Sequence, residues 1–403
     1  MFWKSTEKSE KNSLGRHKSF AYLGDEVYLD AACQTLRPQE VIDAQNEYYL
    51  TYNACGDRVK HKWGNEVDKK VRDVRERVLK YVKASASEYE VAFTLNTTYG
   101  INMILQQLKP EEFERVVISE IEHNSVYVPA QAWAKKQGKE FVVLGRADLG
   151  ELQYEVNDLK KAIVMVNTAS NIDGRELVNV KEIAEDVRKS GGVLILDAAQ
   201  GLTHHPELLH DVKYDALVSS AHKVYGPSLG VTVIAKSLYD RMDFVYLGGS
   251  TVTDTTRDGY TLYPDEKYHM LEPGLQNFAG IIGFGEALLW VENFSHEGKG
   301  RIAHEGELSN MLFDGLQELP VNMVNASASP VVSFYHEKVD GHQIGSLLSS
   351  KNIMCRTGYF CCHAYLVHDR EFPPLARVSL GLYNTREDVE KFLETMKFIT
   401  DNL

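Results

Sequence analysis

A lysine and an aspartate occupy similar settings in the sequence, each shortly after a short apolar run. Asp197 directly follows the run 194–196, and Lys223 ends the segment Ser219-Ser220-Ala221-His222-Lys223, which follows the run 216–218. A lysine amine forms Schiff bases with aldehydes, and a carboxylate can keep a pyridine nitrogen protonated, which makes the ring an electron sink. The pair therefore suits a cofactor that carries an aldehyde on a pyridine ring. The ordinary alternatives are a solvated surface lysine and a helix N-cap aspartate.

Hydroxyl side chains stand where a phosphate could bind. Thr97 and Thr98 open an expected helix after an apolar stretch, and Ser220 and His222 precede the lysine. Hydroxyls and backbone N–H groups at a helix N-terminus bind anions through hydrogen bonds and the helix dipole. Considered alone, the threonines are equally a threonine-rich N-cap without a ligand.

Three further polar side chains follow expected strands. His123 comes after the run 116–118, Asn171 after the run that ends at Val166, and Gln200 shortly after Asp197. An imidazole at a strand end could lie flat on a cofactor ring, although a lone histidine is more often structural. Asn171 suits a hydrogen bond to substrate or cofactor, and it could also belong only to a turn. No companion histidine or acid stands at metal-ligand spacing from Asp197, so no metal site is predicted.

The elements that must position these residues alternate along the chain. Short apolar runs typical of buried parallel strands lie at 116–118, 162–166, 193–196, 216–218 and 231–235. An amphipathic helix is expected before these runs, with a buried face formed by Val67, Val71, Val74, Val78 and Val82. Another is expected between two of the runs, with a buried face formed by Val180, Ile183, Ala184 and Val187 before Gly191-Gly192. The alternation predicts an α/β fold with a mostly parallel sheet and helices on both faces. Ligands of such sheets bind at the carboxyl ends of the strands, where the polar residues stand.

The pattern changes after about residue 285. Segments 330–335 and 377–383 alternate like strands that are buried on one side, and Thr385 with Asp388 opens a final helix whose buried face contains Val389, Phe392, Leu393 and Met396. We therefore expect a large cofactor-binding domain at 20–285 and a smaller α+β domain at 286–403, with residues 1–19 packed nearby. No proline-rich linker separates the two, so they should pack against each other.

Composition bounds the class of protein. The net charge of −13 argues against a nucleic-acid partner, and no apolar run approaches the length of a membrane span. The polar N-terminal segment lacks the apolar core of a secretory signal. The five cysteines are odd in number and lack zinc-ligand spacing, which suits reduced thiols. We expect a cytoplasmic protein that binds neither nucleic acid nor a membrane.

Taken in order, these residues resemble the class V aminotransferase family of fold-type I pyridoxal 5′-phosphate enzymes, and within it the SufS-like (type II) cysteine desulfurases. The resemblance runs from Tyr28-Leu29-Asp30 to the Tyr383-Asn384-Thr385 region. It implies pyridoxal 5′-phosphate as the cofactor and the fold of that enzyme class. Roles then follow for particular residues: Lys223 as the Schiff-base lysine, Asp197 at the ring nitrogen, His123 stacked on the ring, Gln200 at the ring oxygen, Thr97, Thr98, Ser220 and His222 around the phosphate, Asn171 at the substrate or ring, and Arg377 at the substrate carboxylate.

The reaction type is indicated by one cysteine, Cys361. Arg356-Thr357-Gly358-Tyr359-Phe360-Cys361 is similar to the family's Arg-x-Gly-x-x-Cys stretch, whose cysteine attacks the sulfur of the bound substrate. The positive charges of Arg356 and the cofactor lysine favour a thiolate at Cys361. The alternative is an inert buried thiol. Cys362, which directly follows, is a candidate relay for the sulfur.

The resemblance implies that L-cysteine is converted to L-alanine, with a persulfide on Cys361 that passes to an acceptor protein, and that the protein is a homodimer. Another reaction of the same family, by a C–S or selenocysteine lyase, a racemase or an aminotransferase, is the first alternative. A degenerate scaffold that binds a partner without catalysis is the second.

The sequence departs from the family pattern at several positions. Ala31-Ala32-Cys33 stands for the family's Asn-Ala-Ala, and Tyr359-Phe360 stands where two histidines often occur. Leu275 replaces a threonine whose hydroxyl serves the phosphate of the partner subunit. These differences leave the cofactor assignment unchanged and leave the exact substrate open.

Overall fold

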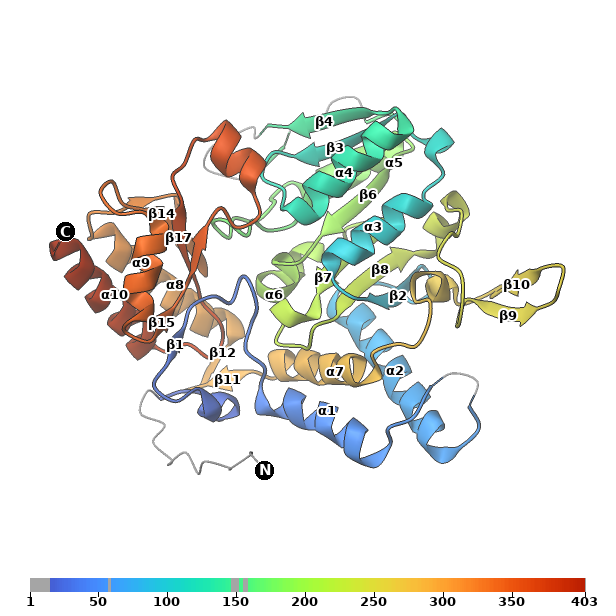
Figure 1. Cartoon of the computed structure of the whole chain (residues 1–403), viewed down its shortest axis with the longest axis horizontal. Helices are drawn as coiled ribbons and strands as arrows, with labels where there is room; N and C mark the ends of the chain where they lie inside the picture. Colours follow the sequence, from blue (N-terminus) through green and yellow to red (C-terminus); the bar gives the residue numbers. More distant parts are fainter. Residues whose placement is uncertain (1–14, 57–58, 146–151, 155–158, 403) are drawn as a thin grey trace.

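The larger of two lobes is built on a seven-stranded sheet in the order β2-β8-β7-β6-β5-β3-β4 (Figure 1). The computed structural model describes residues 15–56, 59–145, 152–154 and 159–402. The strands are β2 (Tyr89–Thr94), β3 (Arg115–Ser119), β4 (Glu140–Leu144), β5 (Ala162–Asn167), β6 (Val193–Asp197), β7 (Ala216–Ser220) and β8 (Gly230–Ala235). The α/β class with a mostly parallel sheet is thus confirmed.

One strand runs against the expected direction. The run 231–235 forms β8, which pairs antiparallel with both β2 and β7 instead of parallel. The connection 221–229 from β7 is too short for the crossover that a parallel neighbour needs, so the chain turns back directly. That short connection is the segment that carries Lys223.

Helices cover both faces of the sheet because successive strand residues point to opposite sides. Val116 and Ile118 of β3 lie in one apolar core with Ile101, whereas Val117 lies in the other core with Val78. The first core is covered by α3 (Thr97–Gln107) and α4 (Asn124–Gln137), and the second by α2 (Lys62–Tyr81), α5 (Val180–Lys189) and α7 (Phe278–Glu292). Helix α1 (Gln39–Thr51) packs on α7.

The smaller lobe contains a four-stranded antiparallel sheet in the order β13-β14-β17-β16. Its elements are β13 (Asn322–Met323), β14 (Val331–Tyr335), β16 (Arg356–Gly358), β17 (Leu375–Ser379), α8 (Arg301–Gln317), α9 (Gly341–Ser349) and α10 (Arg386–Asp401). The expected strand at 377–383 is therefore shorter and begins earlier. It is also buried on both faces: Ala376 and Val378 pack with the helices of this lobe, whereas Leu375 belongs to the core of the larger lobe. Arg377 lies between them, buried at the junction of the lobes.

Shorter elements complete the fold. They are β1 (Val27–Tyr28) paired with β15 (Ile353–Met354), the hairpin β9 (Val252–Thr255) and β10 (Tyr260–Leu262), the pair β11 (Ser295–His296) and β12 (Lys299–Gly300), and α6 (Gly201–His204). The β9–β10 hairpin projects away from the body of the larger lobe (Figure 1). No helix in the described ranges combines the length and the apolar character that a membrane crossing requires.

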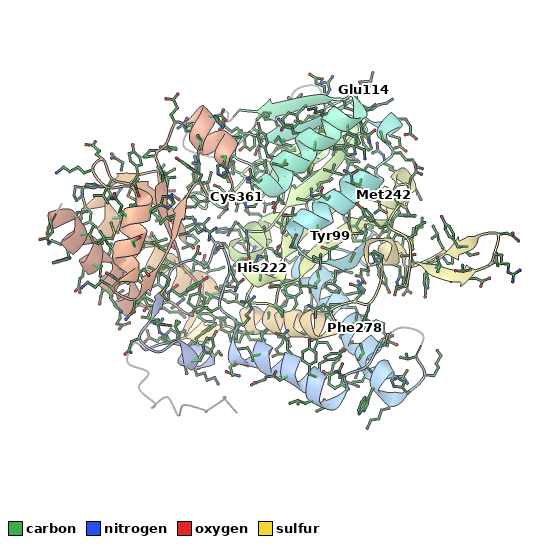
Figure 2. All side chains as sticks on the ribbon, in the orientation of Figure 1. Tyr99, Glu114, His222, Met242, Phe278 and Cys361 are labelled. Carbon is green, nitrogen blue, oxygen red and sulfur yellow. The ribbon has the colours of Figure 1, made fainter. Side chains whose placement is uncertain are left out.

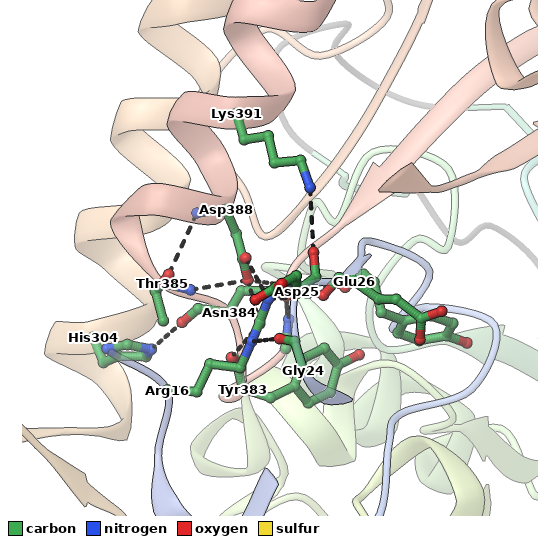
Figure 3. A network of polar contacts seen from close by, with 12 residues as sticks. Arg16, Gly24, Asp25, Glu26, His304, Tyr383, Asn384, Thr385, Asp388 and Lys391 are labelled. Atoms are coloured by element: carbon green, nitrogen blue, oxygen red, sulfur yellow. Dashed lines mark hydrogen bonds and ion pairs between the residues drawn. The ribbon is translucent and has the colours of Figure 1, made fainter. Parts of the chain in front are cut away.

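A buried ion pair ties the N-terminal segment to the smaller lobe (Figure 3). Both terminal nitrogens of Arg16 donate to the carboxylate of Asp388 at 2.7 Å, and the Arg16 side chain is 1% exposed. Asp388 also closes a capping box with Thr385 at the start of α10, as the sequence predicts. The domain boundary at 285/286 stays a prediction, since residue 285 lies within the continuous helix α7. Residues 1–14 of the predicted 1–19 segment lie outside the described residues.

Candidate active site

One cleft at the junction of the lobes brings the predicted site residues together. Its lining includes Thr97, Thr98, His123, Asn171, Asp197, Gln200, Ser220, His222, Lys223, Arg356, Cys361 and Arg377. Figure 2 shows His222 on the larger lobe and Cys361 close to the junction with the smaller lobe. The residues that the sequence places at strand ends thus meet those of the smaller lobe in a single space.

Two neighbouring strands place the lysine and the aspartate. Asp197 ends β6 beside Val218 of β7, and the short turn Ala221–Lys223 follows β7. Asp197 is buried, and its carboxylate accepts the N–H of Ala199 at 2.9 Å, so it does not cap α6. Burial lowers the pKa of Lys223 and raises the pKa of Asp197, while the attraction between the two charges opposes both shifts. A lysine whose amine loses its proton more readily is suited to act as nucleophile and base.

Hydroxyl groups gather at the first turn of α3. The Thr97 N–H donates to Ser220 Oγ at 3.0 Å, and the Thr97 hydroxyl shares a hydrogen bond with the same oxygen at 2.7 Å. The hydroxyls of Thr98 and Ser125 lie 2.7 Å apart. Asn96, and neither threonine, is the N-cap, so the threonine hydroxyls bond to the two serines instead of capping α3 and stand at a helix terminus that favours anions.

Two histidines in the cleft are held neutral. His123 caps α4, and its Nδ1 accepts the N–H of Ser125 at 3.0 Å. Burial, with the charges of Lys223 and Arg377, lowers the pKa of His123 to about 3. Burial, with Lys223 and then Arg37, lowers the pKa of His222 to about 4. A neutral imidazole can pack on a ring or donate a hydrogen bond without adding charge.

A carboxyl group that the sequence reasoning missed lies beneath this edge of the sheet. Glu122 is buried, and its Oε1 accepts hydrogen bonds from the Ser119 hydroxyl and the Asn167 N–H. Burial raises the pKa of Glu122 to about 8, so the group is largely protonated near neutral pH. Its position directly before His123 was the available sequence signal.

Gln200 approaches the cleft from the turn after β6. Its Nε2 donates to the main-chain oxygen of Ala32 at 2.7 Å, and the side chain is buried. This bond joins the turn after β6 to the Ala31-Ala32-Cys33 segment, of which Ala32 and Cys33 also line the cleft. Leu275 is not among the lining residues of this cleft and is 76% exposed just before α7.

Arg377 reaches the cleft from β17 with its guanidinium partly engaged. One terminal nitrogen donates to the main-chain oxygen of Asn171 at 2.8 Å, and the other donates to Asp30 Oδ1 at 3.1 Å. The guanidinium lies over the ring of Phe360, 4.7 Å from its centre. Its Nε has no hydrogen-bond partner among the described residues, and buried polar groups are rarely left in that state. Arg377 can therefore accept a further anion, and Asp30 is a partner that the sequence reasoning missed.

Cys361 stands on a loop with an unusual backbone. Phe360 and Cys361 both have left-handed conformations, with φ of 48° and 58°. Such conformations cost about 1–3 kcal/mol each in residues other than glycine and persist only where the surroundings hold them. The Asn124 N–H donates to the Cys361 oxygen at 2.8 Å and is one such restraint. The loop presents Cys361 as an exposed thiol at the cleft, and the exposed Arg356 of β16 lines the same space.

The comparisons with known proteins cover nearly the whole chain. The family model described as Aminotransferase class-V matches residues 27–392. The chain belongs to this family. A cysteine desulfurase of Pectobacterium atrosepticum is 30% identical over 399 residues, which cover 94% of this chain and 96% of that one. A probable cysteine desulfurase of Haemophilus influenzae is also 30% identical, with 96% and 89% covered.

Solved structures extend the comparison to the fold. The apo structure of a cysteine desulfurase from Thermococcus onnurineus NA1 is 28% identical, with a TM-score of 0.82 over 94% of this chain and 96% of that chain. The predicted fold type and family are therefore confirmed.

Family membership makes pyridoxal 5′-phosphate the cofactor of this chain. The cleft fits that group, because a half-buried lysine and a buried carboxylate lie beside a hydroxyl-lined helix terminus, which matches an aldehyde, a ring nitrogen and a phosphate.

Proposed function

We propose that this chain is a cysteine desulfurase, which converts L-cysteine to L-alanine and keeps the sulfur as a persulfide on Cys361. The observation that carries the proposal is that an exposed thiol, a half-buried lysine and a buried arginine line one cleft. The cysteine desulfurases that resemble the chain over most of its length support it. The fold alone would not, since a cystine C–S lyase at 19% identity has the same fold with a TM-score of 0.77.

The cofactor side of the cleft would hold pyridoxal 5′-phosphate at each of its polar groups. When bound, the cofactor supplies an aldehyde for covalent attachment and a ring that accepts electrons from the substrate Cα. The residues that would bind it are Lys223 at the aldehyde carbon, Asp197 at the ring nitrogen, Gln200 at the ring oxygen, His123 on the ring face, and Thr97, Thr98, Ser125, Ser220 and His222 at the phosphate.

The smaller lobe would bind and orient the amino acid. Arg377 would take the α-carboxylate through Nε and a terminal nitrogen, since a guanidinium meets a carboxylate in two parallel bonds. Asn171, whose main chain and side chain both face this part of the cleft, would border the bound substrate. The exposed Arg356 adds positive charge where an amino acid carboxylate enters.

Two groups of the chain would carry the reaction. Lys223 Nζ, freed when the substrate amine takes its place, removes the Cα proton as a base. Cys361 Sγ then attacks the substrate sulfur, so that an S–S bond forms while the Cβ–S bond breaks. The electron pair left at Cβ takes a proton, and Lys223 Nζ returns a proton to Cα, which gives alanine. The sulfur stays on Cys361 as a persulfide.

A single substitution tests the proposal. Cys361→Ala should abolish alanine and persulfide formation from L-cysteine while the cofactor absorbance remains, because Lys223 and Asp197 are untouched. Alanine, sulfide and pyruvate are quantified together, and the persulfide is located by mass spectrometry. Cys55→Ala, which removes an exposed thiol outside the cleft, is the matched control and should keep full turnover.

Other outcomes favour other functions. A C–S or selenocysteine lyase, racemase or aminotransferase would continue to turn over after Cys361→Ala, because those reactions need no cysteine nucleophile. Tyr359 and Phe360 stand beside the thiol where two histidines often occur in the family. Because of this difference, the variant must be tested for these other reactions as well. A wild-type protein without any borohydride-sensitive cofactor absorbance would instead indicate a binding scaffold without catalysis.

We further propose a sulfur-acceptor protein as a partner, a homodimer as the assembly and the cytoplasm as the location. The exposure of Cys361 supports transfer to another protein. Exposed apolar side chains beside the first turn of α3, at Leu95 and Tyr99, support an interface between subunits. The five free cysteines agree with a reducing compartment. Sedimentation analysis at several protein concentrations tests the dimer.

A further inference from the structure

Cys362 takes part in a hydrogen-bond chain under the Cys361 loop. Its Sγ donates to Asn171 Oδ1 at 3.2 Å, and Asn171 Nδ2 donates to the main-chain oxygen of Phe360 at 3.0 Å. The Cys362 N–H also closes the loop by donating to the Tyr359 oxygen at 2.8 Å. The residue after the exposed thiol thus returns, through Asn171, to the residue before it.

The chain of bonds sets which way the Asn171 amide faces. The Phe360 oxygen accepts only, so the amide must present its NH₂ group there. The amide oxygen then faces the thiol of Cys362, which is a donor, and the opposite orientation would set two acceptors against each other at Phe360. Both bonds are satisfied in one orientation only.

The hydrogen bond from Asn171 restrains the backbone at its two residues with left-handed conformations. Phe360 and Cys361 are left-handed, with φ of 48° and 58°, and the bond from Asn171 holds the carbonyl group between them. Non-glycine residues keep such conformations only where the surroundings impose them. The Asn124 bond to the Cys361 oxygen holds the next peptide, so the two restraints are consecutive.

We propose that Cys362 is a positioning residue, whose thiol donates to Asn171 Oδ1 and so fixes the Asn171 amide in place, and that this amide holds the left-handed loop that presents Cys361 to the substrate sulfur. The proposal rests on the function proposed above. It gives the second cysteine of the pair a role in forming the persulfide rather than in passing the sulfur on.

The structure argues against Cys362 as a sulfur relay. A relay thiol must ionise and be reached by an acceptor. Cys362 is 1% exposed, whereas its neighbour Cys361 is exposed at the cleft. Burial raises the pKa of Cys362 to about 12, so the thiol keeps its proton. The nearest acceptor for that proton is Asn171 Oδ1 at 3.2 Å, whereas the main-chain oxygens of Phe360 and Ile121 lie farther away, at 3.6 Å and 4.0 Å. The relay hypothesis is therefore replaced by the positioning role.

The variants Cys362→Ala and Cys362→Ser separate two roles for this thiol, because a role in core packing and a role in hydrogen bonding predict opposite orders of activity for them. If Cys362 only fills space, Cys362→Ala should be tolerated at least as well as Cys362→Ser, which buries a hydroxyl in an apolar setting. If the thiol orients Asn171, serine keeps a donor and should work better than alanine. Cys355→Ala is the matched control, because Cys355 packs with the apolar core of the smaller lobe.

The kinetic test is alanine release in a single turnover of the cofactor-loaded enzyme with L-cysteine. Cys362→Ala should slow this step about threefold to tenfold, the loss of one modest hydrogen bond. Cys362→Ser should recover most of the rate. The KM should change little, because Arg377 bonds to the main chain of Asn171 and not to its amide.

A second readout requires no turnover. In protein without L-cysteine, hydrogen–deuterium exchange at the Cys362 amide and iodoacetamide alkylation of Cys361 report the order of the loop. Both should be faster in Cys362→Ala, near wild type in Cys362→Ser, and unchanged in Cys355→Ala.

Three results would overturn the proposal: Cys362→Ser slower than Cys362→Ala, no change in loop exchange for Cys362→Ala, or a persulfide found on Cys362 by tandem mass spectrometry. The failure of the proposed function is distinct, because it would appear as continued alanine formation by Cys361→Ala.

Discussion

The two sides of the cleft are constructed differently. On the side proposed to bind the cofactor, here called the cofactor side, Lys223, Asp197 and His123 stand at or just beyond the ends of strands or at the first turn of a helix. On the side proposed to bind the substrate, here called the substrate side, Cys361 stands on a left-handed loop, and Arg377 projects from a buried strand of the other lobe. The first group is positioned by regular backbone hydrogen bonds, whereas the second depends on particular contacts such as those of Asn171 and Asp30.

This difference separates the part of the cleft that fixes the cofactor from the part that determines the type of reaction. Strand ends in a covered sheet move little, which suits a cofactor that must be held in one place. A loop can change its side chains without disturbing the sheet, so the type of reaction can differ between proteins that share the fold. The similarity in fold to a cystine C–S lyase agrees with that division. Substitutions on the two sides should therefore have separable effects.

Lys223→Ala should have the largest effect and should act through the cofactor. Loss of a general base costs about 10²–10⁴-fold in turnover, and here the covalent attachment is lost as well. In wild type, borohydride reduction followed by mass spectrometry should label the Lys223 peptide, and the variant should lack this label. Lys213→Ala, which removes an exposed lysine paired with Glu88, is the control. A variant that keeps a borohydride-sensitive absorbance would break the assignment of the cofactor side.

Arg377→Lys should have an intermediate effect that leaves the cofactor side intact. Lysine cannot bond Asp30, Asn171 and a substrate carboxylate at once, because it lacks the planar fork of arginine. The expected loss in kcat/KM is about 10- to 100-fold, mainly through KM. The cofactor absorbance should be unchanged, and the exposed Arg370→Lys should match wild type. A loss of cofactor absorbance in Arg377→Lys would show that the two sides are not separable.

The cofactor side and the substrate side also differ in how far their residues can be predicted from the sequence. Lys223, Asp197, Ser220 and His123 follow or end short apolar runs, and the rule that ligands bind at strand ends locates them without a structure. The β9–β10 hairpin and the antiparallel direction of β8 were missed, because the run 231–235 reads like any buried strand.

The substrate side depends on contacts that no local pattern encodes. Asp30 is distant in sequence from Arg377, and positive φ at Phe360 and Cys361 has no signal in non-glycine residues. The sequence also cannot distinguish two adjacent cysteines, although one is exposed and the other buried. Cys361 and Arg377 were therefore located by family resemblance and not by residue pattern.

Glu122→Gln should have the smallest effect of these substitutions. Its effect on the pH dependence of stability tests whether the buried carboxyl on the cofactor side is protonated. Burial raises the pKa of Glu122 from 4.5 to about 8, and its bonds to Ser119 and Asn167 oppose that shift. Between these two pKa values the folded protein holds a proton at Glu122 that the unfolded chain has released. The free energy of unfolding therefore falls as the pH rises through this range, by up to about 1.4 kcal/mol per pH unit.

The test is the Tm of the wild-type and variant enzymes measured between about pH 6 and pH 7.5. Wild type should lose about 2–4 °C more than Glu122→Gln over this range, because glutamine is neutral throughout. Glu111→Gln, which removes an exposed carboxylate, should keep the wild-type slope. Parallel curves for wild type and Glu122→Gln would mean that the carboxyl is ionised in the folded protein. A negative charge would then lie near Asp197, and the positive charge of Lys223 would have to balance two carboxylates instead of one.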